Sequence, residues 1–417
     1  MLSRMAETLS NAPWRERVAF LTALAEHLHA YGTTAQRLEG ALLGVASRFG
    51  VECEPWINPT GMILTFRDPA DPAANDITRV IRMAPGEIDL ARLTLADRIA
   101  EDVLAGRIGL AEGRSALARL HWVPTRRWQA MQVLAFGLVA GGITLLLRLP
   151  WLDVATATFA GLCIGLLDLA ARHQPLLRES VEALAAMLAA TIAVLVAGFV
   201  APLNLNTVII ASVIVLLPGM SLTNAINELT SQHLVSGTAR FAGAMSAILK
   251  LTIGTMIALT LAGMLGLSPA VAYSRPQPDW VEGLGLLLSS YAFAVAFRAR
   301  RRDYLLVMAA AMSGYLVSRF AGAALGNVAG IFLSALLLTM AGNLYARWRH
   351  RPGALIRVPG IILLVPGSVS FRGLLNLMHQ QDVGAGEAAL IAVLNILLAL
   401  IAGLLFGNLL APPRRHL

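Results

Sequence analysis

The chain has 417 residues, of which 57% are hydrophobic and only 14% are charged. Soluble globular proteins carry about 25% charged residues, so this composition excludes an ordinary soluble protein. The first 127 residues are mixed, whereas the rest consists of apolar runs of about 16 to 24 residues, the length that crosses a bilayer. The sequence therefore predicts a polytopic α-helical membrane protein with an N-terminal soluble α+β domain, residues 1–127.

The net charge of +8 does not indicate a nucleic-acid partner, because the cations lie at the ends of the apolar runs, where they set membrane topology. The lipid bilayer is the expected surrounding. The two cysteines, Cys53 and Cys163, have neither metal-ligand spacing nor the spacing of a disulfide framework. No metal and no cofactor are expected. The first 20 residues lack the apolar core of a signal peptide, so no cleaved secretory signal is expected.

The N-terminal domain is expected to combine helices with a small sheet. Thr33 and Gln36 have capping-box spacing at the start of the second helix. His27 and His29 are interpreted as an exposed helix end rather than as ligands, and the domain shows no catalytic constellation. A turn at 58–61 between two short apolar runs predicts a hairpin. The expected helices cover residues 17–32, 33–50, 93–109 and 110–122, and the expected strands cover 51–57, 62–66 and 76–83.

The remaining sequence contains ten apolar runs, which we expect to form ten transmembrane helices. Arginines gather before the first run and after each even-numbered run, whereas the opposite loops hold only Arg148, Arg275 and Arg319. The positive-inside rule then places both termini in the cytoplasm. The expected spans are about 128–148, 153–171, 181–201, 207–229, 241–266, 281–297, 304–319, 326–346, 355–378 and 387–410.

A Pro-Gly pair interrupts two of these runs at corresponding places. Pro218-Gly219 lies in the fourth run, and Pro366-Gly367 lies in the ninth run, 148 residues later. Because each half has five spans, the second copy enters the membrane from the other side, as in the inverted repeats of secondary transporters. We therefore expect two inverted five-helix repeats, residues 128–266 and 281–410.

The two breaks also predict a substrate site. Backbone groups freed near the bilayer midplane must find partners, and the N-terminus of a half-helix favours a carboxylate. Glu228 follows the first break and is expected either to pair with a substrate ammonium group or to carry a coupled proton. The residues expected to line the site are Pro218, Gly219, Ser221, Asn224, Asn227, Pro366, Gly367, Ser368, Ser370, Arg372 and Asn376.

Two further charges lie within the apolar runs. Asp168 is a second candidate for proton coupling, with an interfacial ion pair to Arg172 as the alternative interpretation. Lys250 is the only lysine of the chain. Intramembrane charges usually face a cavity or a partner, and long side chains near helix ends can instead extend to the interface. Both interpretations of Lys250 stay open at this point.

The motifs resemble those of the threonine/serine exporter family. "LLPGMSLTNAINELTSQHLVSGTARF" is similar to the motif of that family's first half, and "VPGIILLVPGSVSFRGLLNL" is similar to the motif of its second half. "YGTTAQRLEGALLGVASRFG" and "GEIDLARL" resemble its N-terminal domain. The resemblance implies a fused two-domain exporter of small amino acids in a bacterial-type inner (plasma) membrane, driven by the proton-motive force.

The predicted function is therefore export of threonine- or serine-like amino acids, with protons as the coupled ion. An exporter of small dicarboxylates and a passive small-solute channel are the alternatives. An enzyme is not expected, because no paired acids, metal cluster or Ser/His set lies at membrane depth. The sequence does not determine the oligomeric state, and a homo-oligomer is one of the open alternatives.

Overall fold

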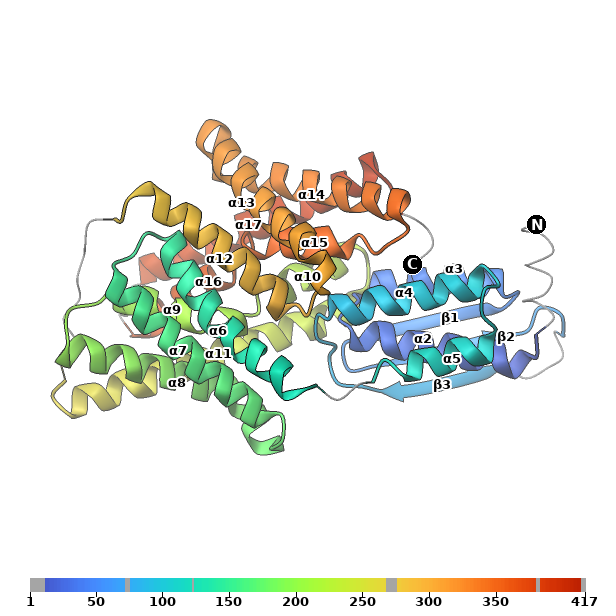
Figure 1. The fold of residues 1–417 in the computed structure, drawn as a ribbon, viewed down its shortest axis with the longest axis horizontal. Helices are drawn as coiled ribbons and strands as arrows, with labels where there is room; N and C mark the ends of the chain where they lie inside the picture. Colours follow the sequence, from blue (N-terminus) through green and yellow to red (C-terminus); the bar gives the residue numbers. More distant parts are fainter. Residues whose placement is uncertain (1–11, 72–75, 122–123, 268–275, 380–382, 414–417) are drawn as a thin grey trace.

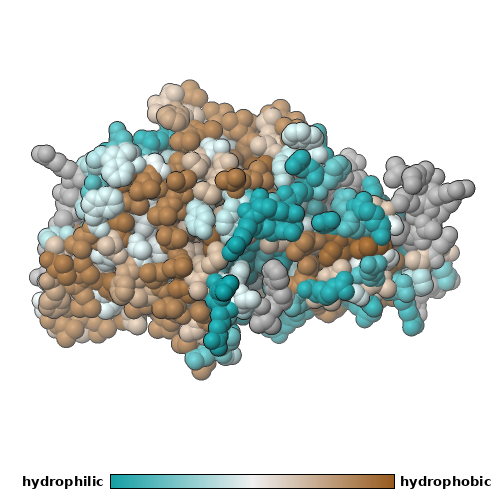
Figure 2. All heavy atoms as spheres, viewed as in Figure 1, coloured by the Kyte–Doolittle hydropathy of each residue, from teal (hydrophilic) through white to brown (hydrophobic). Residues whose placement is uncertain are grey.

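The computed structural model describes residues 12–71, 76–121, 124–267, 276–379 and 383–413. Figure 1 shows an N-terminal unit of helices and a small sheet, in blue to cyan, beside a bundle of longer helices, in green to red. Figure 2 shows that hydrophobic surface covers much of the bundle, whereas hydrophilic surface lies on the N-terminal unit and along the junction. This distribution is that of a membrane bundle with a polar unit attached at one end.

The N-terminal unit (residues 12–121) packs helices against a three-stranded antiparallel sheet of order β1-β2-β3. In the β1–β2 hairpin, Asn58 pairs with Gly61, and Asn58 Oδ1 accepts a hydrogen bond from the Thr60 amide at 3.1 Å. The predicted hairpin, third strand and helices are all present. The elements are α2 (Trp14–Ala30), α3 (Ala35–Arg48), β1 (Glu52–Asn58), β2 (Gly61–Arg67), β3 (Ile77–Arg82), α4 (Leu90–Leu104) and α5 (Leu110–Ala118).

The expected exposure of the two histidines at the end of α2 is wrong. His27 and His29 are buried, because α2 packs against α3, α4 and α5 and contributes Phe20, Leu24 and Leu28 to the core of the unit. His27 Nδ1 lies 2.7 Å from the Ala23 carbonyl oxygen. Burial lowers the pKa of both histidines, because the charged ring loses its hydration there.

The bundle contains twelve α-helical segments within the described residues. Four of them form two broken pairs, α9 with α10 and α15 with α16, at the two Pro-Gly sites. The segments are α6 (Arg126–Leu146), α7 (Trp151–Ala171), α8 (Pro175–Phe199), α9 (Leu205–Ser212), α10 (Gly219–Thr230), α11 (Leu234–Met264), α12 (Asp279–Ala296), α13 (Tyr304–Leu325), α14 (Asn327–Arg349), α15 (Ala354–Ile362), α16 (Gly367–His379) and α17 (Val383–Leu410).

Eight helices among the described residues are long and apolar enough to cross a membrane, and nine are if the bent pair Leu205–Ser212 and Ile214–Thr230 counts as one span. The sixth expected span is present as α12 but is not among them. Its first turn holds two acidic residues, Asp279 and Glu282, which lower its apolar content. The chain is therefore a multi-pass membrane protein, while the expected number of ten spans stays a prediction.

The two halves of the bundle pack their helices in matching pairs. In the first half α8 packs on α11 and α10 packs on α11, and in the second half α14 packs on α17 and α16 packs on α17. Contacts between the halves match as well, because α10 touches α17 and α11 touches α16. The first helices of the halves, α6 and α12, lie against each other so closely that a Cβ on Gly142 would lie 2.8 Å from the Ser289 amide nitrogen.

Candidate substrate site at the paired helix breaks

The first break separates α9 from α10. The chain makes a 3₁₀ turn at Ile214–Leu216, and the segment Ile214–Thr230 differs in direction from Leu205–Ser212 by 56°. The backbone at Pro218 is not helical (φ −80°, ψ 38°), and α10 begins with a hydrogen bond from the Leu222 amide to the Pro218 carbonyl oxygen at 2.9 Å. No side chain caps α10, so the amides of its first turn point out of the helix end without an intrahelical acceptor.

The second break lies between α15 and α16, and it has the same kind of helix start but not the large bend, because Ala354–Leu377 counts as a single membrane span. The Ser370 amide donates to the Pro366 carbonyl oxygen at 2.9 Å, which begins α16 in the same way. Proline suits this place because its missing N–H is not needed at a helix start. Glycine follows in both copies, where a Cβ atom would be crowded by the other break.

The two breaks lie against each other. A Cβ placed on Gly367 would lie 3.1 Å from the Gly219 amide nitrogen, and a Cβ placed on Gly219 would lie 2.6 Å from Val365 Cγ2. Segments that are far apart in the sequence therefore bring the N-termini of two half-helices together. Each N-terminus carries a partial positive charge, so this junction is suited to a negatively charged group.

The polar residues after the breaks are mostly half-buried in α10 and α16. Ser221, Asn224, Ser368 and Asn376 are neither fully buried nor fully exposed. The Ser370 hydroxyl donates to the Pro366 carbonyl oxygen at 2.8 Å, within its own turn. Arg372 is the exception, since it is exposed. Pro218 is half-buried and Pro366 is buried, in line with their place at the junction.

Glu228 lies at the other end of α10. It is nine residues after Gly219, about 13 Å along the helix at 1.5 Å per residue. Its neighbour in sequence, Asn227, faces the α10–α11 turn, where its carbonyl oxygen accepts a hydrogen bond from the Ser231 hydroxyl at 2.8 Å. A small amino acid held at Gly219 does not extend over this distance, so the geometry does not bring Glu228 to a substrate ammonium group at the breaks.

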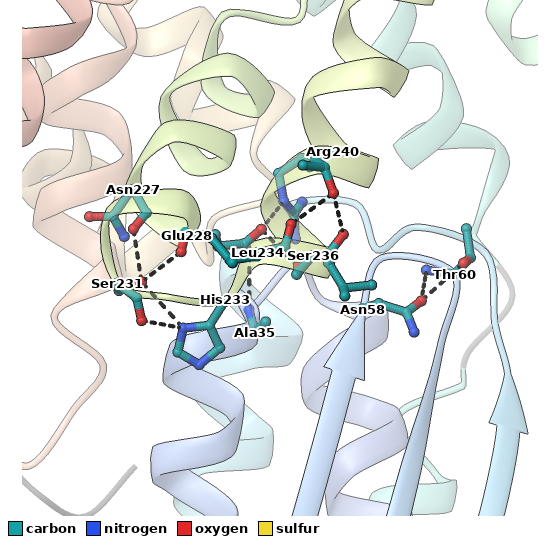
Figure 3. Close-up of polar contacts among 12 residues, drawn as sticks. Ala35, Asn58, Thr60, Asn227, Glu228, Ser231, His233, Leu234, Ser236 and Arg240 are labelled. Carbon is teal, nitrogen blue, oxygen red and sulfur yellow. Dashed lines mark hydrogen bonds and ion pairs between the residues drawn. The ribbon is translucent and has the colours of Figure 1, made fainter.

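The Glu228 carboxylate is fully buried and accepts four hydrogen bonds (Figure 3). Arg240 donates through Nε to Oε2 and through Nη2 to Oε1, each at 3.1 Å, which is the bidentate geometry of a strong ion pair. The Ser236 hydroxyl donates to Oε2 at 2.8 Å. The fourth donor is the backbone amide of Ala35, at 3.0 Å from Oε1.

The Ala35 contact corrects the expected capping box of α3. Thr34 is the N-cap residue and caps nothing with its side chain, and the Thr33 hydroxyl is buried without a partner. The first amide of α3 is capped instead by Glu228, 193 residues later in the chain. Helix N-termini favour a carboxylate, and here the membrane part supplies it. We call the cluster of Ala35, Glu228, Ser236 and Arg240 the α3 latch.

A second contact extends the latch. His233, in the turn between α10 and α11, places Nε2 2.8 Å from Glu39 Oε2 on α3, and Nδ1 lies 2.9 Å from the Ser231 carbonyl oxygen. Glu39 Oε1 also accepts a hydrogen bond from the Ile57 amide in β1 at 3.3 Å. The α3 latch and this contact together fix the N-terminal unit to the first half of the bundle.

The N-terminal unit also contacts the second half of the bundle. The first amides of α4, from Leu90 and Ala91, donate to the carbonyl oxygens of Phe297 and Arg298 at 3.0 and 3.1 Å. Arg298 Nη2 lies 2.7 Å from Glu87 Oε2. The unit therefore touches both halves, which sequence reasoning missed because none of these residues forms a local motif.

The two other intramembrane charges have nearby partners. Asp168 Oδ2 lies 2.7 Å from Arg172 Nη2, one helical turn away. Lys250 donates through Nζ to the Glu179 carbonyl oxygen at 2.7 Å, and the same nitrogen lies 3.6 Å from Glu182 Oε2. Lys250 is thus held by α8. Among the described residues, no group of three or more histidine, cysteine, aspartate or glutamate side chains is placed to hold a metal ion.

Comparisons with known proteins match both the N-terminal unit and the bundle. Residues 19–262, more than half of the chain, match the family model ThrE, whose description names a threonine/serine exporter. The chain belongs to the threonine/serine exporter family. Residues 282–410 match a second model of this family, described as "Threonine/Serine exporter, ThrE". The predicted family is confirmed, and the family indicates a membrane exporter rather than an enzyme.

Relatives of this exporter-family chain occur in bacteria and in yeasts. It is 24% identical to a "Probable threonine/serine exporter" of Mycobacterium tuberculosis, over 99% of this chain and 80% of that protein. It is 25% identical to "Pheromone-regulated membrane protein 10" of Candida albicans, over 88% of this chain but only 34% of that protein. The corresponding protein of Saccharomyces cerevisiae is 22% identical over 85% of this chain and 47% of its own length. No solved structure matches the chain.

Proposed function

We propose that the protein exports small amino acids of the threonine and serine type and holds its substrate at the two Pro-Gly breaks. The observation that carries this proposal is the contact between Gly219 and Gly367. In the proposed site, amides of the two half-helix N-termini bind the substrate carboxylate, with the Ser221 and Ser368 hydroxyls beside them. Asn224 contacts the remainder of the substrate. Arg372 is left out of this contact set, because its side chain is exposed.

The contact between the breaks is too close to leave room for a substrate between the two glycines. Binding therefore requires α10 and α16 to separate, which gives a simple alternating cycle of a closed junction and an opened one. The matching helix pairs of the two halves support an inverted repeat, in which one half moves against the other.

We further propose that export is coupled to protons, with Glu228 and Asp168 as the candidate carriers. Each carboxylate is paired with an arginine, Arg240 and Arg172 respectively. Protonation of Glu228 would remove the charge that holds Arg240 and the α3 amide. Proton binding at Glu228 would therefore loosen the α3 latch, which links coupling to the N-terminal unit rather than to the substrate itself.

The proposed setting is a bacterial-type inner membrane with both termini in the cytoplasm. The ends of α7 and α12 and the start of α6, which carry arginine clusters, lie together beside the N-terminal unit. The positive-inside rule would place that end of the bundle in the cytoplasm, together with the unit.

Counterflow in proteoliposomes tests the proposed function. Vesicles loaded with unlabelled threonine or serine should accumulate labelled threonine transiently, and an imposed proton gradient should change the extent of accumulation. Vesicles loaded with a small dicarboxylate should show no such exchange. Exchange of the dicarboxylate alone would contradict the amino-acid assignment, and equilibration that ignores the proton gradient would contradict coupling.

A further inference from the structure

A cavity of about 530 Å³ lies at the junction of the N-terminal unit and the bundle, a size typical of small-ligand sites. Three parts of the chain form it: the start of α4, the region from Pro124 to Gln132 at the start of α6, and the loop between α12 and α13. The end of α7 closes it with Arg172. We call this cavity the junction pocket. It is separate from the paired breaks and is not used by the proposed transport site.

The lining of the junction pocket is strongly basic. It contains one acidic residue, Asp89, and six arginines, which are Arg92, Arg127, Arg172, Arg298, Arg300 and Arg301. Asp89 is occupied by protein groups, since it caps α4 through the Arg92 amide at 2.9 Å and lies 3.8 Å from Arg298 Nη1. Arg298 also pairs with Glu87, and Arg172 pairs with Asp168.

Three of these arginines have no carboxylate partner among the described residues: Arg127, Arg300 and Arg301. Arg127 and Arg301 are exposed at the rim, whereas Arg300 is half-buried. Arg300 Nη1 is buried and has no hydrogen-bond partner in the described structure. Leaving a buried guanidinium N–H without an acceptor costs free energy. A bound anion would accept this hydrogen bond and remove the cost.

The rest of the lining suits an amphipathic ligand. Trp128 and Tyr304 are half-buried in the wall, and Arg298 lies over the Trp128 ring with its guanidinium carbon 5.3 Å from the ring centroid. Met131 and Val295 add apolar surface. Burial lowers the pKa of Arg300, and the positive charge of Arg302 adds to this effect, while the negative charge of Asp303 opposes it.

We propose that the junction pocket binds a phosphate group, with Arg127, Arg300 and Arg301 as its ligands. Guanidinium groups bind phosphate oxygens through paired N–H donors. The phosphate can belong to an anionic phospholipid, because basic pockets at the ends of membrane helices bind such headgroups, or to a free phosphate ion. Because the pocket is lined by α4 and by both halves of the bundle, a bound phosphate would tie the three together.

Thermal unfolding of the full-length protein in a neutral detergent tests the proposal. The probes are short-chain phosphatidylglycerol, short-chain phosphatidylcholine as the zwitterionic control, and inorganic phosphate, with chloride at equal ionic strength. The pocket variant is Arg127→Gln with Arg300→Gln. The matched control is Arg349→Gln, an exposed arginine in the last turn of α14, outside the pocket lining.

We expect phosphatidylglycerol or inorganic phosphate to raise the Tm of the wild-type protein and of Arg349→Gln in a saturable way. The apparent affinity should fall at least about tenfold in the pocket variant, because charge-assisted hydrogen bonds are lost. A response to phosphatidylglycerol alone identifies a lipid headgroup, and an equal response to inorganic phosphate identifies a free phosphate.

If the pocket variant does not fold, Arg127→Gln with Arg301→Gln replaces it, since both side chains are exposed. An equal Tm response in wild type and pocket variants, or no anion response in the wild type, overturns the proposal.

Discussion

At the scale of single residues, the Glu228 side chain on α10 forms hydrogen bonds to both α3 and α11. Its carboxylate joins Arg240, Ser236 and the α3 amide, and it is completely buried. A buried ion pair contributes little net stability compared with apolar residues, but removing one partner leaves a buried charge alone. The α3 latch is therefore sensitive to the loss of either charge.

Glu228→Gln should destabilise the protein by about 3 kcal/mol, because Arg240 loses its charged partner inside the structure. Thermal unfolding of the purified protein should show this as a clear drop in Tm. The matched control is Asp168→Asn, which breaks the exposed ion pair with Arg172, one helical turn away. Such a pair stabilises the folded protein by about 0.5 kcal/mol or less. Equal Tm changes in the two variants would contradict the latch.

The buried histidines make stability depend on pH. Burial lowers the folded-state pKa of His27 and His29 below the ordinary value, about 6.5. Below that pH the unfolded chain binds protons that the folded chain does not, so the free energy of unfolding should fall as pH drops from 6.5, by up to about 1.4 kcal/mol per pH unit for each histidine. Denaturant titrations at pH 7.5, 6.5 and 5.5 measure this slope.

His29→Gln should reduce the slope, and His173→Gln, which removes an exposed histidine, should leave it unchanged. A wild-type stability that is constant between pH 7.5 and 5.5 would show that neither buried ring resists protonation.

At the scale of elements, the first helices of the two halves share a close seam. A Cβ on Gly285 in α12 would lie 2.3 Å from the Leu146 amide nitrogen in α6, whereas a Cβ on Gly283 would meet no atom within 4 Å. Both helices end in the same way as well. Arg148 and Arg298 follow them with φ of 58° and 55°, a left-handed conformation that is uncommon for residues other than glycine.

Gly285→Ala should lower the Tm markedly, because the added methyl group meets backbone atoms that cannot move without separating α6 from α12. Gly283→Ala, two residues away in the same helix, should be neutral or slightly stabilising, since alanine favours a helix by about 1 kcal/mol over glycine. Equal Tm values for the two variants would contradict this seam.

The sequence predicted these elements well where the signal is local. The apolar runs predicted the helices of the bundle, and the turn at Asn58–Gly61 predicted the hairpin. Pro218 and Pro366 predicted the two breaks. It failed where partners are distant. The cap of α3 comes from Glu228, and the burial of His27 depends on packing that no local pattern reveals.

At the scale of the whole molecule, a buried aspartate accepts hydrogen bonds at two places about 150 residues apart, from an amide in the first half and from an arginine in the second. Asp153, in the first turn of α7, accepts a hydrogen bond from Asn204 just before α9, at 2.5 Å. Asp303, just before α13, binds Arg351 just before α15 through two hydrogen bonds of 2.8 Å. Both aspartates are buried. This repetition extends the Pro-Gly correspondence and supports the proposed repeat, and a comparison of the two halves of the sequence could have found it.

The most direct test of the central claim, that the substrate is carried at the paired breaks, is threonine counterflow by Gly219→Ala and Gly367→Ala in proteoliposomes. Each added methyl group would press one break against the other, so the account predicts that both variants fold but lose at least about tenfold in initial rate, a change in barrier of about 1.4 kcal/mol or more. Gly243→Ala, in open space on α11, should transport at the wild-type rate. Wild-type rates in all three variants would contradict the account.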